Sequence, residues 1–260
     1  MKLSVVIITY NEEVNLPRTL EGVMPLVRDG QGEIIVVDSG STDGTVEIAQ
    51  SYGAKVFMQT WKGYAAQKNS AIEKADGDWI LSLDADEEVE SGLAREIRVA
   101  AQGGDLGFLI PRKNFFLGRW IRHGGFWPDP KLRLFRKGAA RFDDRRVHED
   151  ARLTEGIAGS LKHAIIHHSY PTLSDYIDHM NRYSSLGAEM LAAKAYRGFS
   201  VINIALRPFL TFVYNYFFRL GLLDGREGLL LHLYHAAYVS WKYAKAWELT
   251  RVKRRPSPSR

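Results

Sequence analysis

Hydrophobic residues follow two different patterns along the first hundred residues. Short, continuous runs rich in β-branched residues predict buried strands, and they lie at 3–9, 33–37, 54–57 and 78–83. Apolar residues spaced three or four positions apart predict helices between the strands, at 12–27, 43–52 and 64–74. Buried strands that alternate with helices indicate an α/β fold, in which a mostly parallel sheet has helices on both faces.

After Gly103 and Gly104 the predicted strands become shorter and less regular. They lie at 108–112, 131–136 and 140–143, and a run with three histidines predicts another strand at 163–168. From Leu173 the apolar spacing is helical as far as Trp247.

These patterns divide the chain into three regions. We expect an α/β domain at 1–170, with halves at 1–103 and 104–170. A helical region at 171–250 follows, and the basic, Pro- and Ser-rich residues 251–260 are expected to form a disordered tail. At the start of the chain, a short strand without a cleavage site behind it is not expected to be an export signal.

Composition and missing motifs exclude several classes of protein. The chain contains no cysteine, which rules out disulfides, zinc–thiolate sites, iron–sulfur clusters and thiol nucleophiles. Neither the Gly-rich loop of dinucleotide-binding proteins nor the P-loop of phosphohydrolases is present. Dinucleotide oxidoreductases and P-loop enzymes are therefore poor interpretations of this α/β pattern.

Polar and acidic residues lie directly after three of the predicted strands. Asp38 follows the second strand, Asp84 and Asp86 follow the fourth, and Thr-Tyr-Asn-Glu at 9–12 ends the first. Because the carboxyl ends of parallel strands meet at one edge of a sheet, we expect these residues to form one acidic crevice. Two carboxylates with one residue between them suit Mg²⁺ or Mn²⁺, shared with the phosphates of a substrate.

Three other classes fit parts of this pattern. A nucleotidyltransferase should have a Gly-rich loop with a basic residue after its first strand, where this chain has Tyr10, Asn11 and Glu12. Loss of Asp84 or Asp86 would favour a non-catalytic scaffold that binds sugars or nucleotides, but both acids are present. Nucleic acid is not expected as a partner, because only the basic tail would support it.

Four segments occur in a specific order and spacing within the first hundred residues. They are SVVIITYNE at 4–12, VDSGSTDGT at 37–45, GYAAQKN at 63–69 and LDADEE at 83–88. Together they resemble family 2 glycosyltransferases of the GT-A fold. The resemblance implies an inverting transfer of a sugar from a nucleotide-diphosphate sugar, assisted by Mg²⁺ or Mn²⁺.

Four later segments resemble a narrower branch of that family. They are RHGGFWPD at 122–129, LRLFR at 132–136, RVHE at 146–149 and LGLLDG at 220–225. The branch consists of bacterial transferases that glucosylate the inner core of lipopolysaccharide. This resemblance implies UDP-glucose as the donor and a lipopolysaccharide-core or other cell-envelope glycolipid as the acceptor.

The family resemblance also implies roles for individual residues of the first half. Asp38 would accept a hydrogen bond from the base, Lys68 would neutralise the diphosphate, and Asp84 would approach the ribose. Asp86 would hold the metal. The whole implied nucleotide-sugar pocket consists of Thr9, Tyr10, Asn11, Glu12, Asp38, Ser41, Lys68, Asp84 and Ala85.

A general base must take the proton from the acceptor hydroxyl. Glu149 is the preferred candidate because the branch segment ends there, and Asp150 is its rival because many relatives use an acidic pair. An alternative acceptor is a polyprenyl phosphate, which is already ionised and needs no strong base. In that case Glu149 would be dispensable.

Candidate acceptor residues lie in the second half. Arg133 and Arg136 could clamp an anionic group, although a regular strand points them to opposite faces. The Gly-rich segment around His123 and Trp127 is a candidate acceptor loop whose rings stack on sugars. One of the histidines at 163–168 could complete the metal site, although a shared site for all three is not expected.

Charge is distributed unevenly along the chain. Residues 197–260 contain eleven Lys or Arg against three acids, within a chain whose net charge is +5. The helical region has no apolar stretch of the ~20 residues that cross a bilayer, so it is expected to lie at an anionic membrane surface or to form a homodimer. The expected location is the cytoplasm, peripheral on the inner face of the cytoplasmic membrane.

Overall fold

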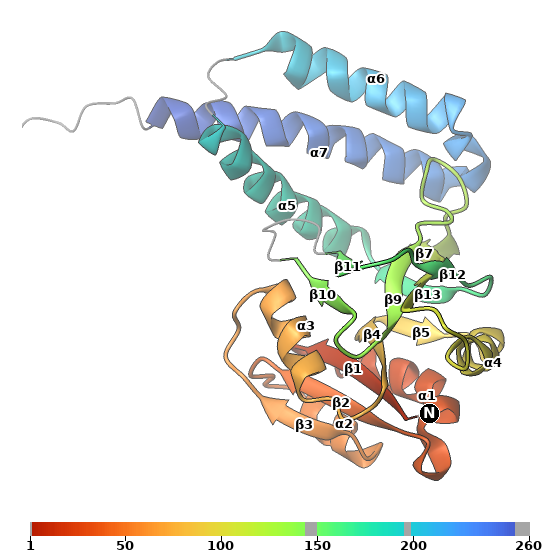
Figure 1. Cartoon of the computed structure of the whole chain (residues 1–260). Helices are drawn as coiled ribbons and strands as arrows, with labels where there is room; N and C mark the ends of the chain where they lie inside the picture. The colour runs from red at the N-terminus through yellow and green to blue at the C-terminus, as the bar shows by residue number, and fades with distance from the viewer. Residues whose placement is uncertain (1, 144–149, 195–198, 253–260) are drawn as a thin grey trace, which may run out of the picture. The chain divides into compact units, whose positions relative to one another are not determined.

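The computed structural model describes residues 2–143, 150–194 and 199–252. The chain forms two compact units (Figure 1). The first, here called the sheet unit, consists of 1–114 and 128–168, and the second, the helical unit, consists of 115–127 and the residues from 169 onward.

Hydrogen bonds connect the segment 115–127 with the rest of the helical unit. The sequence pattern assigned it to the α/β domain, but it groups with the helical unit. Gly124 N donates to Arg219 O (2.9 Å), and His123 N donates to Asp224 Oδ2 (2.8 Å). These hydrogen bonds connect residues about a hundred positions apart, which no local pattern could reveal.

The main sheet of the sheet unit has seven strands in the order β12-β6-β9-β4-β1-β2-β3. Its parallel centre consists of β1 (Leu3–Thr9), β2 (Gly32–Asp38), β3 (Lys55–Met58) and β4 (Trp79–Asp84). β9 (Lys131–Arg136) is antiparallel to both of its neighbours, β4 and β6 (Gly107–Ile110), and β12 (Gly159–Ser160) is parallel to β6. The expected α/β fold with a mostly parallel sheet is confirmed.

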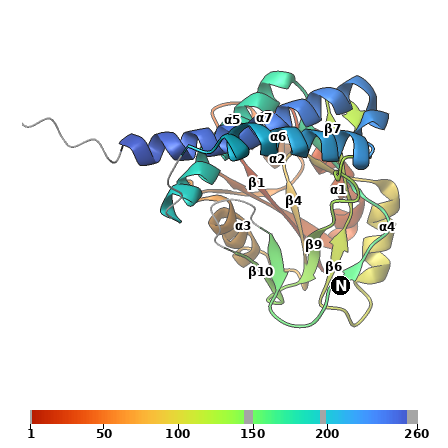
Figure 2. The same ribbon diagram turned by 90° about the horizontal axis from the view of Figure 1, so that it is seen from above.

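Helices cover both faces of this sheet, because neighbouring strand residues point to opposite sides. On one face Val5 and Ile7 belong to a core with α1 (Leu16–Val27), α2 (Thr45–Ser51) and α4 (Ser91–Ala100). On the other face Val6 packs in a core with α3 (Tyr64–Glu73). Figure 2 shows α3 and α4 on opposite sides of the strands.

Smaller elements complete the sheet unit and continue into the helical unit. They are η1 (Arg28–Gly30), the pair β10 (Ala140–Phe142) and β11 (Ala151–Leu153), and a sheet in the order β5 (Glu87–Val89), β13 (Ile165–Tyr170), β7 (Arg112–Phe116), β8 (Arg119–Trp120). β13 pairs antiparallel with β5, so that His167 lies opposite Glu87. This pairing brings a late histidine beside the acids that follow β4.

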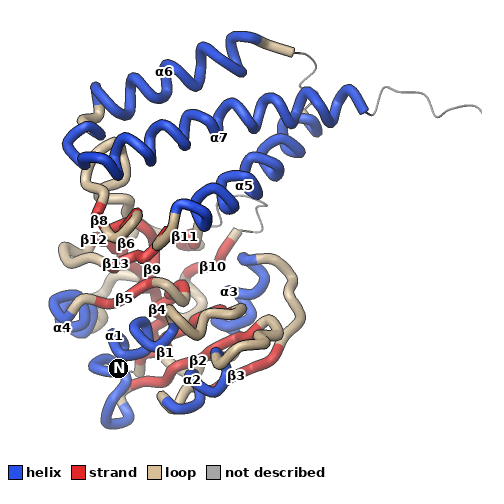
Figure 3. The backbone as a smooth tube through the Cα atoms, turned by 180° about the vertical axis from the view of Figure 1, so that it is seen from behind, coloured by secondary structure: helices blue, strands red, loops and turns tan. Residues whose placement is uncertain are grey.

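The helical unit contains two long helices, α5 and α7, and a further helical segment that folds back along α7 (Figure 3). Its elements are α5 (Leu173–Ala193), η2 (Ile202–Leu206), α6 (Arg207–Val213), η3 (Tyr214–Phe218), η4 (Gly221–Asp224) and α7 (Gly225–Val252). Thr172 and Asp175 form a capping box at the start of α5. Both α5 and α6 pack against α7. Within the described residues, no helix is long and apolar enough to span a bilayer.

Several local predictions need correction. The helix expected from residue 12 begins at Leu16, and the helix expected from residue 43 begins at Thr45. The strand expected at 108–112 is two strands, β6 and β7, that leave out Pro111, whose ring removes a backbone donor. Arg251 lies in α7 instead of the tail, whose residues 253–260 are outside the described residues.

Candidate active site

The turn after β2 is organised by Asp38. Its side chain is fully buried and accepts four hydrogen bonds, from Thr9 Oγ1 (2.8 Å), Ser41 Oγ (2.6 Å), and the backbone N of Gly40 (2.9 Å) and Ser41 (2.8 Å). Burial would raise the pKa of Asp38, but these donors lower it. A charged Asp38 therefore fixes the turn at the carboxyl edge of the sheet.

The turn after β1 is connected to the same loop. Asn11 N donates to Ser41 Oγ (2.8 Å), and Asn11 Oδ1 accepts from Thr42 N (2.8 Å). Burial, together with Asp86 and other nearby acids, raises the pKa of Glu12, although Asn15 opposes this shift. Tyr10 is exposed beside these residues. The loops after β1 and β2 are thus connected at one edge of the sheet, where their positions in the sequence had placed them.

The carboxylate of Asp84, at the end of β4, pairs with two positively charged side chains. Its Oδ1 lies 2.6 Å from Lys68 Nζ of α3, and its Oδ2 accepts from Arg133 Nη2 of β9 (2.6 Å). Burial alone would raise the pKa of Asp84, but Arg133 and Lys68 hold it well below its usual value. Both cations are buried, so the crevice that the sequence predicted to be acidic also contains positive charge.

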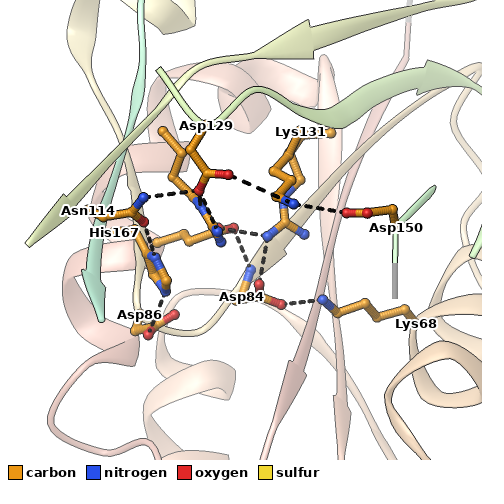
Figure 4. A network of polar contacts seen from close by, with 11 residues as sticks. Lys68, Asp84, Asp86, Asn114, Asp129, Lys131, Asp150 and His167 are labelled. Carbon is orange, nitrogen blue, oxygen red and sulfur yellow. Dashed lines mark hydrogen bonds and ion pairs between the residues drawn. The ribbon is translucent and has the colours of Figure 1, made fainter. Parts of the chain in front are cut away.

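A second buried carboxylate, Glu87, extends this network. Glu87 Oε1 accepts from Arg133 Nη2 (2.7 Å) and lies 3.2 Å from Arg112 Nη1, while Glu87 Oε2 accepts from Asp84 N (3.0 Å). Arg112 also pairs with Asp129 at 2.7 Å. These charges come from β4, β5, β7 and β9, and Figure 4 shows the network of polar contacts around Asp84 and Asp129.

Asp86 faces a histidine. His167 Nε2 lies 3.2 Å from Asp86 Oδ2, and both side chains are largely buried but retain some exposure. Burial would raise the pKa of Asp86, but His167 opposes it and the pKa is lowered. His163 and His168 do not join the pair, because they contact Glu96 and Glu88 respectively. This separation of the three histidines agrees with their positions along the chain.

Asn114 determines which nitrogen of His167 faces Asp86. A carboxylate can only accept, so Asn114 Nδ2 must face Asp129 Oδ2 (3.0 Å). The amide oxygen of Asn114 therefore faces His167 and accepts from Nδ1 (2.8 Å). Nδ1 carries a proton in this arrangement, and Nε2 on the Asp86 side is the nitrogen available to a cation.

The donor set of Asp86 and His167 fits a divalent cation. Adjacent ligands of an octahedral ion with bonds of ~2.1 Å are about 3.0 Å apart, and the two side-chain atoms are 3.2 Å apart. Among the described residues, no three His, Asp or Glu side chains gather as a metal site. A cation here would take its other ligands from water and from substrate phosphates.

Comparison with known proteins identifies the family of this chain. The family model described as glycosyl transferase family 2 matches residues 4–151, more than half of the chain. The chain belongs to glycosyltransferase family 2. It is similar to the lipopolysaccharide core biosynthesis glycosyltransferase LpsC of Rhizobium meliloti (strain 1021), with 31% identity over 268 residues that cover 99% of this chain and 96% of LpsC.

Solved structures show that this transferase has the GT-A fold. The mannosyltransferase PcManGT from Pyrobaculum calidifontis, in complex with GDP-Man and Mn²⁺, has a TM-score of 0.55 at 16% identity, covering 95% of this chain and 87% of that one. S. aureus TarS 1-349 in complex with UDP-GlcNAc has a TM-score of 0.50 at 18% identity, covering 97% and 92%. The fold that the sequence segments implied is confirmed.

The candidate bases of the transferase are only partly placed. Glu149 lies outside the described residues. Asp150 is exposed, and its Oδ1 accepts from Lys131 Nζ at 3.0 Å. Lys131 Nζ also lies 3.8 Å from Asp129, so it connects Asp150 to the buried charge network (Figure 4).

The structure separates the predicted acceptor residues. Arg133 is buried in the network around Asp84, whereas Arg136 donates to the carbonyls of Gly103 (2.8 Å) and Asp105 (3.2 Å). Trp79, which begins β4, stacks on Arg136, so Arg136 lies at the opposite edge of the sheet from Asp84. β9 is irregular at Arg133, where its register with β6 shifts, but the two arginines still lie toward opposite ends of the strand.

His123 and Trp127 belong to the helical unit. His123 Nδ1 lies 2.9 Å from Asp224 Oδ1, and the ring of Trp127 packs edge-on against Trp120. Both side chains thus help to shape the loop that contains them, and their roles toward an acceptor remain predictions.

Sequence reasoning missed several members of the charge network, namely Glu87, Arg112, Asn114 and Asp129. Glu87 and Asp129 lie within the segments that resemble the family, which is a usable signal. Arg112 and Asn114 have no such signal, because they reach the site only through the pairing of β7. Ala85 contributes through its backbone, whose carbonyl accepts from Thr19 Oγ1 (2.7 Å).

Proposed function

We propose that this family 2 transferase moves glucose, with inversion, from UDP-glucose to a lipopolysaccharide-core or other cell-envelope glycolipid acceptor. The observation that carries the proposal is the juxtaposition of the Asp86–His167 pair with two buried cations, Lys68 and Arg133, at the carboxyl edge of the sheet. The name of the similar LpsC supports the acceptor class.

The cations account for recognition of a diphosphate. Lys68 and Arg133 are buried at the place where α/β sheets bind ligands, and each is held in position by Asp84. Arg133 Nε is buried without a hydrogen-bond partner among the described residues. Positive charge that is fixed before the reaction stabilises the negative charge that develops on a nucleoside-diphosphate leaving group.

Asp86 and His167 would hold Mg²⁺ or Mn²⁺, which neutralises phosphate charge when it is bound. Asn114 directs Nε2 of His167 toward that position by accepting from Nδ1. Asp38 and its hydrogen bonds keep the adjoining turn in place for the nucleoside. The chain's own residues thus bind the donor and orient it for attack.

A carboxylate at 149 or 150 would accept the proton of the acceptor hydroxyl. Asp150 lies at the end of the chain of contacts through Lys131 and Asp129, which supports a location near the donor site. If the pair acts in this way, Glu149 is the base and Lys131 holds its neighbour Asp150 in place.

The decisive experiment measures nucleotide release from a panel of sugar nucleotides, with Mn²⁺, with Mg²⁺ and with EDTA. We expect hydrolysis of UDP-glucose that needs a cation and that Asp86→Ala reduces at least about 100-fold. Turnover of a different donor would correct the sugar. Absence of turnover and of binding for every donor, with membrane extract present as acceptor, would contradict the proposal.

The acceptor and the base are tested together. Transfer to a lipopolysaccharide-core acceptor should fall about 100-fold or more in Glu149→Gln, while donor binding stays unchanged. Asp150→Asn is the matched variant, and a larger loss there would assign the base to Asp150. A Glu149→Gln variant with full activity toward a polyprenyl phosphate would instead favour that acceptor.

A further inference from the structure

The helical unit exposes a large apolar surface on one helix. The segment η2-α6-η3 forms a continuous helix from Ile202 to Phe218. Seven of its apolar and aromatic side chains are exposed, among them Phe209 at 62% and Phe218 at 76%. We call this set the outer face, and it consists of Ile202, Leu206, Phe209, Leu210, Tyr214, Phe217 and Phe218.

The opposite side of the same helix has a partner. Ser240 Oγ of α7 donates to the carbonyl of Ile204 (2.8 Å), and Arg207, at the border between the two sides, stacks on and donates to Tyr243 of α7. Pro208, on that side, is buried. Both sides of this helix are therefore apolar, but only one of them packs against α7.

The exposed surface continues beyond this helix. Leu220, Leu222 and Leu223 follow Phe218, and Leu229 and Leu233 lie on the adjoining part of α7, all of them exposed. Soluble monomers seldom expose so many neighbouring large apolar side chains, and such a patch indicates an interaction surface.

The charge around the outer face identifies the partner. Residues 190–223 contain no Asp or Glu but four Lys or Arg. Two of these, Arg207 and Arg219, are exposed on the described helix. Asp224, the next acid along the chain, is buried and bonded to His123. A second copy of the chain packed face to face would therefore bring cation against cation, and Glu227, the acid of the adjoining part of α7, already pairs with Arg119.

A bilayer with anionic headgroups supplies what the surface lacks. Its acyl region accepts apolar side chains, its interface suits Tyr and Phe, and its phosphates pair with Arg. We infer that the outer face docks into the interface of an anionic lipid bilayer and lies parallel to it. The docking is independent of the proposed chemistry, although it would hold the transferase at a surface that contains glycolipids.

A hollow on the outer face agrees with this inference. It has a volume of about 400 Å³ and is lined by Ile202, Leu206, Arg207, Leu210, Thr211 and Tyr214. Apolar walls beside one guanidinium match the junction between an acyl chain and a phosphate headgroup.

Vesicle sedimentation tests the inference with the full chain. The vesicles contain phosphatidylcholine alone or phosphatidylcholine mixed with phosphatidylglycerol. We expect binding to the anionic vesicles, and Phe209→Ser with Phe218→Ser should weaken it at least about tenfold. The matched control, Val14→Ser with Ile157→Ser, removes apolar side chains that are 77% and 91% exposed on the sheet unit and should bind like wild type.

Three outcomes would overturn the inference. One is equal binding of wild type to both kinds of vesicle, and another is equal loss in the outer-face variant and in the control. The third is a wild-type dimer in sedimentation velocity that the outer-face variant dissolves while vesicle binding is absent. Hydrolysis of the sugar nucleotide without acceptor should be unchanged in both variants, which separates this test from the test of the proposed function.

Discussion

The two edges of the main sheet each carry a network of charges, and the cations of the two networks differ in burial. At the amino edge Glu33 accepts from Ser4 Oγ (2.6 Å), Lys55 Nζ (2.7 Å) and Asp76 N (2.7 Å), and Lys55 is half exposed. At the carboxyl edge Asp84 pairs with Lys68 and Arg133, whose charged groups are almost completely buried.

This difference separates a structural cluster from a functional one. A cation near water costs little to hold in place, and one anion with three donors is sufficient to join neighbouring strands and a loop. Buried cations are expensive to desolvate and add little stability over apolar packing. Lys68 and Arg133 are therefore best explained by a charged ligand that the carboxyl edge binds, whereas the amino edge needs no ligand.

The largest effect should come from removing the carboxylate shared by the buried cations. Asp84→Asn leaves Lys68 and Arg133 without their common partner, so we expect the free energy of unfolding to fall by about 3 kcal/mol. Urea denaturation measures this change. In a double-mutant cycle, Arg133→Gln should be much less harmful when Asp84→Asn is already present. Additive losses would mean that the pair is not coupled.

The two lysines of the two edges provide a direct comparison of function. Lys68→Met should reduce hydrolysis of the donor about 100-fold, because a fixed positive charge near the diphosphate is lost. Lys55→Met, at the amino edge, should leave the activity within about twofold of wild type. Steady-state kinetics on both variants decides the matter, and a similar loss in both would remove the distinction between the edges.

A smaller effect is expected from Asn114, which touches no ligand in the proposal. Asn114→Leu frees the ring of His167, and the affinity for Mn²⁺ should fall about 10- to 100-fold. Calorimetric titration with Mn²⁺ and nucleotide measures this affinity. Asn69→Leu is the control, because it removes another side-chain amide that bridges Phe142 in the sheet unit. Its cation affinity should be that of wild type.

The smallest effect concerns Glu33, whose pKa is lowered to about 2. Burial acts against this shift, but Lys55, Ser4 and the backbone of Asp76 outweigh it. A lowered pKa stabilises the fold above the unfolded value near 4.5, and the contribution disappears as the pH falls toward 2. Glu33→Gln should cost about 1–2 kcal/mol at pH 7 and progressively less below pH 4.5. A cost independent of pH would contradict this origin.

Much of the sheet unit follows from local sequence. The apolar runs at β1, β2 and β4 identify strands because only buried strands need continuous β-branched residues, and β1 was predicted with its observed bounds, Leu3–Thr9. The position of Asp38, Asp84 and Asp86 after strands also placed them at one edge, since parallel strands share their direction. Periodicity and strand direction are local properties, so they can be predicted from the sequence.

Tertiary structure alone decided which residues complete the site. His167 reaches Asp86 because β13 runs antiparallel to β5, and Arg133 reaches Asp84 because β9 enters the sheet beside β4. The same pairing of β9 places Arg136 at the far edge of the sheet. Register between strands distant in sequence depends on the packing of the whole unit, and no spacing along the chain encodes it.

The helical unit shows the same division between local and tertiary information. The sequence predicted helices that contain many aromatic and positively charged residues, but it left open whether their apolar side chains pack internally or face outward. Only the packing of α6 against α7 divides them into a buried side and the outer face. The sequence of a helix shows which side chains are apolar enough to be buried, and the arrangement of its neighbours determines which of them remain exposed.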